Sequence, residues 1–177
     1  MKRHGFAVGL ALTVLAVLEL SGPAAIGERV PFKGRLEGIV TINPVDPPIM
    51  FVLVEGSGKA NHFGEFTVRI PHVVNRSNSS AVGFYQFVAA NGDTLTADFT
   101  GQATPTSTPG VLYIEETATI TGGTGRFAHA TGKFICERLF DSVAGTTTGS
   151  FEGTVSLRHG GRHDDHDDDD NDDRCDD

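Results

Sequence analysis

The sequence predicts an all-β protein, an eight-stranded antiparallel barrel, on three observations. Short runs of alternating or continuous apolar residues are separated by Gly, Pro, Asn and Asp. No stretch after residue 28 has the sustained apolar period of a helix. The chain has 177 residues, which suits one domain. Short strands at even spacing, without helices, are typical of barrels and sandwiches.

Eight strands are expected, at about 32–42, 49–57, 62–72, 81–90, 94–102, 111–121, 132–141 and 147–157. Most of them alternate, as half-buried strands of an antiparallel sheet do. In 111–121, Glu116 intrudes on the face formed by the apolar residues Leu112, Ile114, Ala118 and Ile120. Asn91–Gly92 predicts a tight hairpin, because both positions accept a positive φ.

Two of these strands are apolar on both faces. The run 49–54 is apolar throughout, and 81–90 carries Val82, Phe84 and Val88 on one face and Tyr85, Phe87 and Ala89 on the other. Such strands are covered on both sides. The cover is either an oligomer interface or a loop or tail of the same chain.

Residues 1–27 have the pattern of a signal peptide. Lys2 and Arg3 precede an apolar run over 6–18, and small residues follow, with cleavage expected after Ala25 or Gly27. The run is short for a membrane span, although an uncleaved anchor is the alternative. We therefore expect a secreted, extracytoplasmic protein that has no contact with the membrane after cleavage.

The charge divides the rest of the chain into a β-barrel domain, 28–158, and an acidic tail, 159–177. The formal net charge is −9, and the tail alone holds ten Asp. The tail has hardly an apolar residue, so we expect it to be disordered. Neither part has the basic surface that nucleic acid binding needs, which excludes that class of partner.

The tail contains four residues that are weak metal-ligand candidates, His163, His166, Asp167 and Asp169. Carboxylates and imidazoles bind cations, but the spacing does not fit an EF-hand, so no specific metal site and no cofactor is expected. A solvated tail that keeps the protein soluble is the simpler interpretation. Of the two cysteines, Cys136 shares parity with apolar residues, which favours a buried thiol over a bridge to Cys175.

A glycine-rich segment, 120–134, is the most distinctive motif. Its GGTGRF sequence does not fit a dinucleotide fingerprint, because no parallel βαβ unit surrounds it. We expect Phe127 to plug one end of the core. With Ala130 and Gly132, the segment resembles the turn before the penultimate strands of dirigent proteins and allene oxide cyclases, and most of all bacterial secreted proteins of that barrel family. The resemblance implies an eight-stranded antiparallel barrel that forms a trimer, and it carries over no catalytic residue.

Polar residues on the inward parity are the candidates for a site. Glu116 and Arg138 form either a structural ion pair or a group that polarises a ligand, and they are the candidate catalytic residues if the protein is an enzyme. His62 and Tyr85 complete the expected ligand-binding set, and His72 lies at the other end of the strand that His62 begins. No known catalytic motif is present.

Three functions follow from these observations. The first is binding of a small apolar molecule in the lumen or mouth of the barrel. The alternative to such binding is a lumen that is simply filled by side chains. The second is a cofactor-free cyclase or isomerase, or dirigent-like stereocontrol of a reactive substrate. The third is a structural or interaction protein whose acidic tail binds cations or a basic partner.

Overall fold

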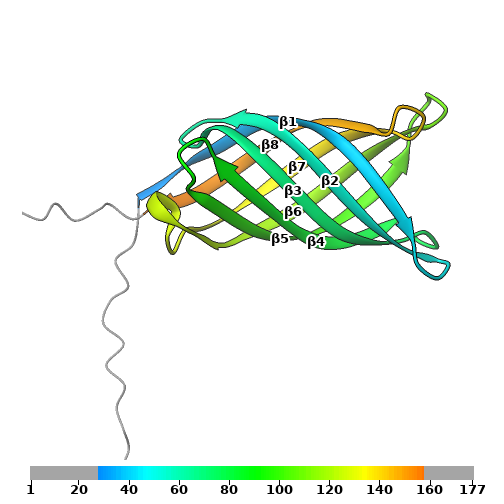
Figure 1. The fold of residues 1–177 in the computed structure, drawn as a ribbon, viewed down its shortest axis with the longest axis horizontal. Coiled ribbons are helices and arrows are strands. Elements are labelled where there is room, and N and C mark those ends of the chain that lie inside the picture. The colour runs from blue at the N-terminus through cyan, green and yellow to red at the C-terminus, as the bar shows by residue number, and fades with distance from the viewer. Residues whose placement is uncertain (1–27, 158–177) are drawn as a thin grey trace, which may run out of the picture.

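The computed structural model describes residues 28–157, which form a closed barrel of eight antiparallel strands (Figure 1). Each strand pairs with its neighbours in sequence, and the last pairs with the first. The strands are β1 (Glu28–Pro44), β2 (Ile49–Ala60), β3 (Gly64–Asn75), β4 (Ser80–Ala89), β5 (Thr94–Pro105), β6 (Val111–Gly123), β7 (Thr131–Asp141) and β8 (Thr146–Leu157). The predicted fold class is confirmed. β1 is longer than expected, because its pairing with β8 continues to Glu28 opposite Leu157.

The half of the lumen nearest the chain ends is packed with aromatic side chains. Phe32 lies at its centre, with its ring centroid 4.9 Å from that of Phe151 and 5.6 Å from that of Phe134. Phe66 and Phe87 meet edge to face at 5.2 Å. Buried aromatic residues of this kind dominate the energy of a core. This half of the barrel therefore contains the aromatic part of the core.

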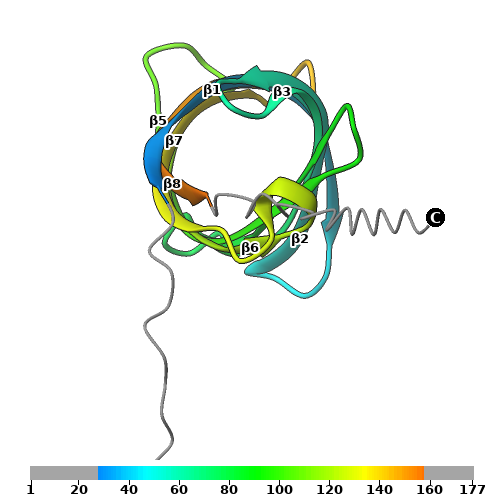
Figure 2. The same ribbon diagram turned by 90° about the vertical axis from the view of Figure 1, so that its left-hand side faces the viewer.

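The glycine-rich segment closes this end of the barrel. It forms a short 3-10 helix, η1 (Gly125–Phe127), which Figure 2 shows within the outline of the barrel ring. The Phe127 ring packs 4.6 Å from that of Phe63, and its side chain is buried. Gly125 has a φ of +56°, a left-handed conformation that favours glycine. The prediction that Phe127 plugs one end of the core is confirmed.

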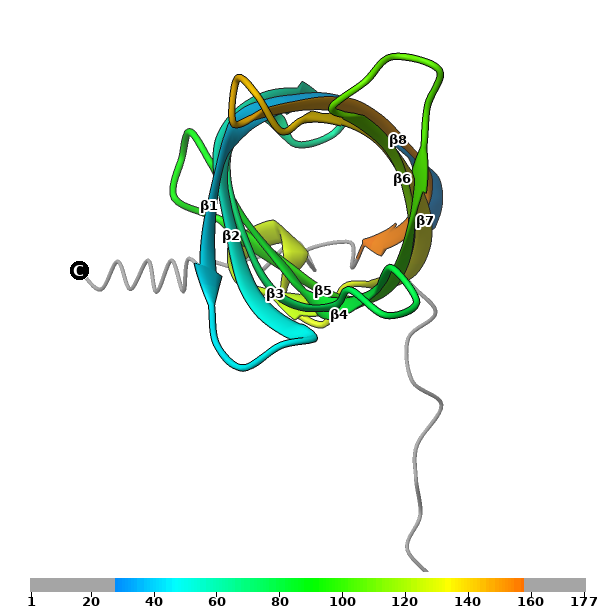
Figure 3. The same cartoon turned by 90° about the vertical axis from the view of Figure 1, so that its right-hand side faces the viewer.

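The opposite end, which we call the loop end, carries the β1–β2, β3–β4, β5–β6 and β7–β8 hairpin loops (Figure 3). Most inward-facing apolar side chains near this end remain partly exposed, whereas those of the aromatic half are buried apart from Val30 and Leu157 at its rim. Ile42 is exposed, and the half-buried ones are Val40, Met50, Val74, Ala81, Ala103, Leu112, Ile114 and Phe140. Solvent therefore reaches an apolar wall inside this end of the barrel.

Apolar side chains are exposed on the outer surface of β2 and β4, the two strands that are apolar on both faces. On β4, Tyr85, Phe87 and Ala89 are buried inside the barrel, and Val82, Phe84 and Val88 face outward, each at least 40% exposed. Phe51 of β2 is also exposed. Which partner or segment covers this face stays a prediction.

Several predictions concern residues outside the described range. The signal peptide, the acidic tail and Cys175 all lie there. Cys136 is buried and forms no disulfide within residues 28–157, so its pairing with Cys175 stays untested. No helix within residues 28–157 has the length and apolar character needed to cross a bilayer.

Candidate functional site

Three of the predicted site residues meet inside the barrel, where the aromatic half ends. Tyr85 comes from β4, Glu116 from β6 and Arg138 from β7, and each is at most 2% exposed. The Tyr85 ring stacks on that of Phe87 at 5.4 Å, which places the cluster directly against the aromatic packing. Inward parity predicted the positions of Glu116 and Arg138; it left the direction of Tyr85 open, and the structure brings all three together.

The cluster is a closed network of hydrogen bonds around the Glu116 carboxylate. Arg138 donates from Nε to Oε2 at 3.1 Å and from Nη2 to Oε1, and the Tyr85 hydroxyl donates to Oε2. Arg138 Nη1 also donates to Thr147 Oγ1 at 3.3 Å, and Thr147 in turn donates to the carbonyl of Leu139 at 3.0 Å. Within residues 28–157, no buried side-chain nitrogen or oxygen lacks a partner.

The pKa values of the cluster favour one fixed protonation state. Burial, with the charge of Glu116, raises the pKa of Tyr85 well above 10, so the phenol keeps its proton. Burial opposes the charge of Arg138, but Glu116 outweighs burial and raises the pKa of the guanidinium. Glu116 accepts three hydrogen bonds and both of its partners hold their protons, so the arrangement is better suited to fixing polar groups in place than to transferring a proton.

Three glycines make room for the polar side chains of the lumen. Gly83 lies opposite His72, Gly149 lies opposite Arg138, and Gly101 lies opposite Glu116. At each glycine an added Cβ would overlap a side-chain atom of the facing residue. Sequence reasoning missed these glycines and Thr147. The sequence signal that could have found the glycines is an inward-facing glycine on the strand beside an inward-facing polar residue.

His72 lies beside this cluster, near the loop end. It is 7% exposed, and its ring centroid is 5.8 Å from that of Phe99. Nδ1 lies 2.9 Å from the carbonyl oxygen of Ile70. Burial is the main reason that its pKa is below 6.5, and the positive charge of Arg138 acts in the same direction.

His62 is separated from the other predicted ligand-binding residues. It lies in the exposed turn between β2 and β3, at the η1 end, with a φ of +58°. β3 begins only at Gly64, so the alternation of the strand does not extend to His62. The prediction that the strand begins at His62 is wrong, and a role of His62 in ligand binding stays a prediction.

The tail candidates for a metal site lie outside the described residues, so cation binding there stays a prediction. Within the barrel itself, no group of three or more His, Cys, Asp or Glu side chains is placed to hold a metal ion.

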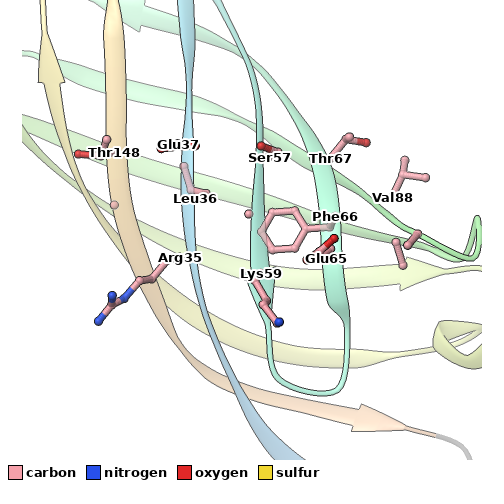
Figure 4. A pocket seen from close by; sticks show the side chains of 14 residues that line it. Arg35, Leu36, Glu37, Ser57, Lys59, Glu65, Phe66, Thr67, Val88 and Thr148 are labelled. Carbon is pink, nitrogen blue, oxygen red and sulfur yellow. The ribbon is translucent and has the colours of Figure 1, made fainter.

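A separate hollow of about 720 Å³ lies on the outside, over β1, β2 and β3, and extends to β4 and β8 (Figure 4). Its charged lining consists of two cations, Arg35 and Lys59, and two carboxylates, Glu37 and Glu65. All four side chains are exposed and face outward. Their charges balance, so the hollow has no preference for a ligand of either sign, and it is distinct from the buried cluster in the lumen.

No family model and no curated protein matches the sequence. Solved structures do match. The pterocarpan synthase dirigent protein GePTS1 has a TM-score of 0.55 and 12% identity, covering 77% of this chain and 89% of its own. The pterocarpan synthase dirigent protein PsPTS1 has a TM-score of 0.53 and 12% identity, covering 76% and 99%. At this identity the likeness concerns the fold alone: this chain has the eight-stranded barrel fold found in dirigent proteins.

Proposed function

We propose that the barrel binds a small, largely apolar molecule inside its loop end, above the cluster of Tyr85, Glu116 and Arg138. One observation carries the proposal. Most inward apolar side chains of the loop end are half-buried or exposed, whereas those of the other half are buried apart from Val30 and Leu157 at its rim. Binding sites are typically lined by apolar side chains with a few fixed polar groups, which is the composition found here.

The buried cluster of Tyr85, Glu116 and Arg138, which we call the polar floor of the loop end, is easier to explain by a role in binding than by a contribution to stability. A buried ion pair contributes little net stability, because the desolvation of both charges offsets their attraction. Here the pair also requires glycines at 101 and 149, which weaken a strand. An ion pair that costs this much is well suited to orient a bound molecule.

A neutral apolar dye, N-phenyl-1-naphthylamine, tests the proposal, because its fluorescence rises when it leaves water. We expect saturable binding to the full chain. Ala103→Trp fills the inside of the loop end and should weaken binding by roughly tenfold or more, the scale of a few lost apolar contacts. Thr104→Trp is the matched control, because residue 104 is the exposed neighbour on the same strand.

Either of two results would overturn the proposal. One is the absence of saturable binding by the dye. The other is equal binding by wild type and Ala103→Trp together with a loss in Thr104→Trp, which would place the dye on the outer surface. Native mass spectrometry of the protein from its own host would then identify any molecule that it retains.

The alternative function is stereocontrol of a reactive substrate without a cofactor. The names of the two solved neighbours, both pterocarpan synthase dirigent proteins, support this alternative. The apolar wall would hold the substrate in one conformation and the fixed floor would orient its polar end. It predicts that the chain changes the stereochemical ratio of a product formed from the retained molecule, and that Arg138→Met abolishes the change.

A further inference from the structure

We propose that Nε2 of His72 accepts a hydrogen bond from the molecule bound at the loop end, and that this molecule carries a hydroxyl group. The inference rests on the proposed function and extends it to the chemical class of the ligand. Its basis is the tautomer, burial and position of this imidazole.

The tautomer of His72 follows from its hydrogen bond. Nδ1 lies 2.9 Å from the Ile70 carbonyl oxygen, and a carbonyl only accepts, so Nδ1 carries the proton. In the neutral ring, Nε2 is then a bare acceptor. Burial holds the pKa of His72 below 6.5, so the ring is neutral at pH 7.

Nε2 has no hydrogen-bond partner among the residues that the structure describes. Within residues 28–157, the hydrogen bond of His72 to Ile70 is its only one, yet no fully buried polar side-chain atom lacks a partner. Nε2 is therefore reached from the solvent side although the residue is only 7% exposed. His72 is on the inward face of β3, so this access is from within the loop end.

The groups around His72 favour a neutral ligand. The charged side chains that act on it from the other strands are Arg138 of β7 and Glu116 of β6. Tyr85 and Cys136 interact with that pair and both keep their protons. On the strands beside it, Val52 of β2 pairs with His72 and Phe99 of β5 contacts its ring. Arg138 is already neutralised by Glu116. A charged ligand would lose its hydration with no unpaired partner in return, which costs several kcal/mol per ion in general.

The neighbouring strand is shaped to leave His72 in place. Gly83 of β4 lies directly opposite, and a Cβ there would overlap the imidazole side chain. The edge contact with Phe99 orients the ring from the other side. The acceptor is therefore fixed before the ligand arrives. A fixed acceptor favours binding because the side chain loses little conformational freedom when the ligand binds.

Two probes of nearly equal shape isolate this hydrogen bond: 2-naphthylmethanol, which donates, and its methyl ether, which does not. Titration calorimetry on the full chain should give tighter binding of the alcohol by roughly two- to tenfold, the net value of one hydrogen bond. His72→Leu should abolish the preference for the alcohol, and His72→Gln, whose amide oxygen also accepts, should retain part of it. His129→Asn, an exposed position at the η1 end, is the control and should retain all of it.

The wild-type chain supplies a second test that does not depend on a variant folding. Protonation of Nε2 removes the acceptor, so the preference should be full at about pH 7.5 and fall as the pH drops below 6.5. A preference that remains at a pH low enough to protonate the ring of His72, or that is unchanged in His72→Leu, would overturn the role of His72.

The outcomes separate this inference from the proposed function. If alcohol and ether bind equally and Ala103→Trp weakens both, the loop end binds apolar molecules and His72 does not select them. If neither probe binds, both proposals fail.

Discussion

Gly149 of β8 lies directly opposite Arg138 of β7, and the Arg138 side chain fills the space that a side chain at 149 would need. We expect Gly149→Ala to lower the free energy of unfolding by about 1–3 kcal/mol, as overpacking does, and to displace Arg138 from Glu116. Urea unfolding measures the effect. Ser150→Ala, on the exposed face of the same strand, should change the stability by less than about 0.5 kcal/mol. Equal stability of Gly149→Ala and wild type would show that the fit is not tight.

Removal of Arg138 alone should be far more damaging than removal of the whole charge pair. Arg138→Met leaves the Glu116 carboxylate buried and unpaired, which should cost about 3–5 kcal/mol. In Glu116→Gln/Arg138→Met, no charge remains and Tyr85 keeps an acceptor, so much of that loss should be recovered.

The exposed ion pair of Lys33 and Glu152 is the matched control for this double-mutant cycle. Its side chains are 55% and 71% exposed, and the nitrogen and oxygen are 2.5 Å apart. Lys33→Met should cost at most about 1 kcal/mol. If the double variant of the buried pair were as unstable as Arg138→Met, the cost would come from lost packing instead of an unpaired charge.

The alternation of the sequence was sufficient to predict the fold and the direction of most side chains. Period two puts Glu116 and Arg138 inside the barrel, because a register slip would turn the apolar residues of their strands outward. It could not decide the direction of Tyr85, because both faces of β4 are apolar. The same rule failed for His62, where the chain turns instead of continuing the strand. Alternation gives the face of a residue only within the strand itself.

The alternation of the sequence could not predict that Glu116 contacts Arg138. Across the β6–β7 ladder, Glu116 pairs with Cys136, and Arg138 pairs with Ile114. The two charged residues are diagonal neighbours, which long side chains can bridge. The register between strands depends on the whole barrel. The contacts of Arg138 with Thr147 and Gly149 on the next strand could therefore not be predicted from the pattern of a single strand.

The Cys136 thiol should be unreactive in the folded protein. Burial, together with the charge of Glu116, raises its pKa to about 12, and the thiolate is the reactive form. Cys175→Ser leaves Cys136 as the one cysteine of the chain. We expect this variant to show no reaction with a disulfide reagent at about pH 8 and one thiol per chain after unfolding in urea. Rapid reaction before unfolding would show that the lumen opens at Cys136.

The barrel should lose stability in alkali because of Cys136 and Tyr85. Both groups hold their protons more tightly when folded than at their ordinary pKa values of 9.0 and 10.0. Their stabilising contribution is therefore complete below about pH 9 and is lost as the pH rises above it. The free energy of unfolding should fall progressively from about pH 9 upward, and Tyr85→Phe should make that fall less steep.

The two tyrosines of the chain should be distinguishable in the same experiment. The hydrogen bond to Glu137 raises the pKa of Tyr113 to about 12, while Tyr85 ionises only on unfolding. Ultraviolet absorbance of phenolate should therefore show one tyrosine titrating in the folded barrel. Tyr113→Phe should remove that signal, and Tyr85→Phe should leave it unchanged. If Tyr85→Phe instead removed a signal near pH 10, the phenol would be open to solvent, and the floor of the loop end would not be the closed network of Tyr85, Glu116 and Arg138.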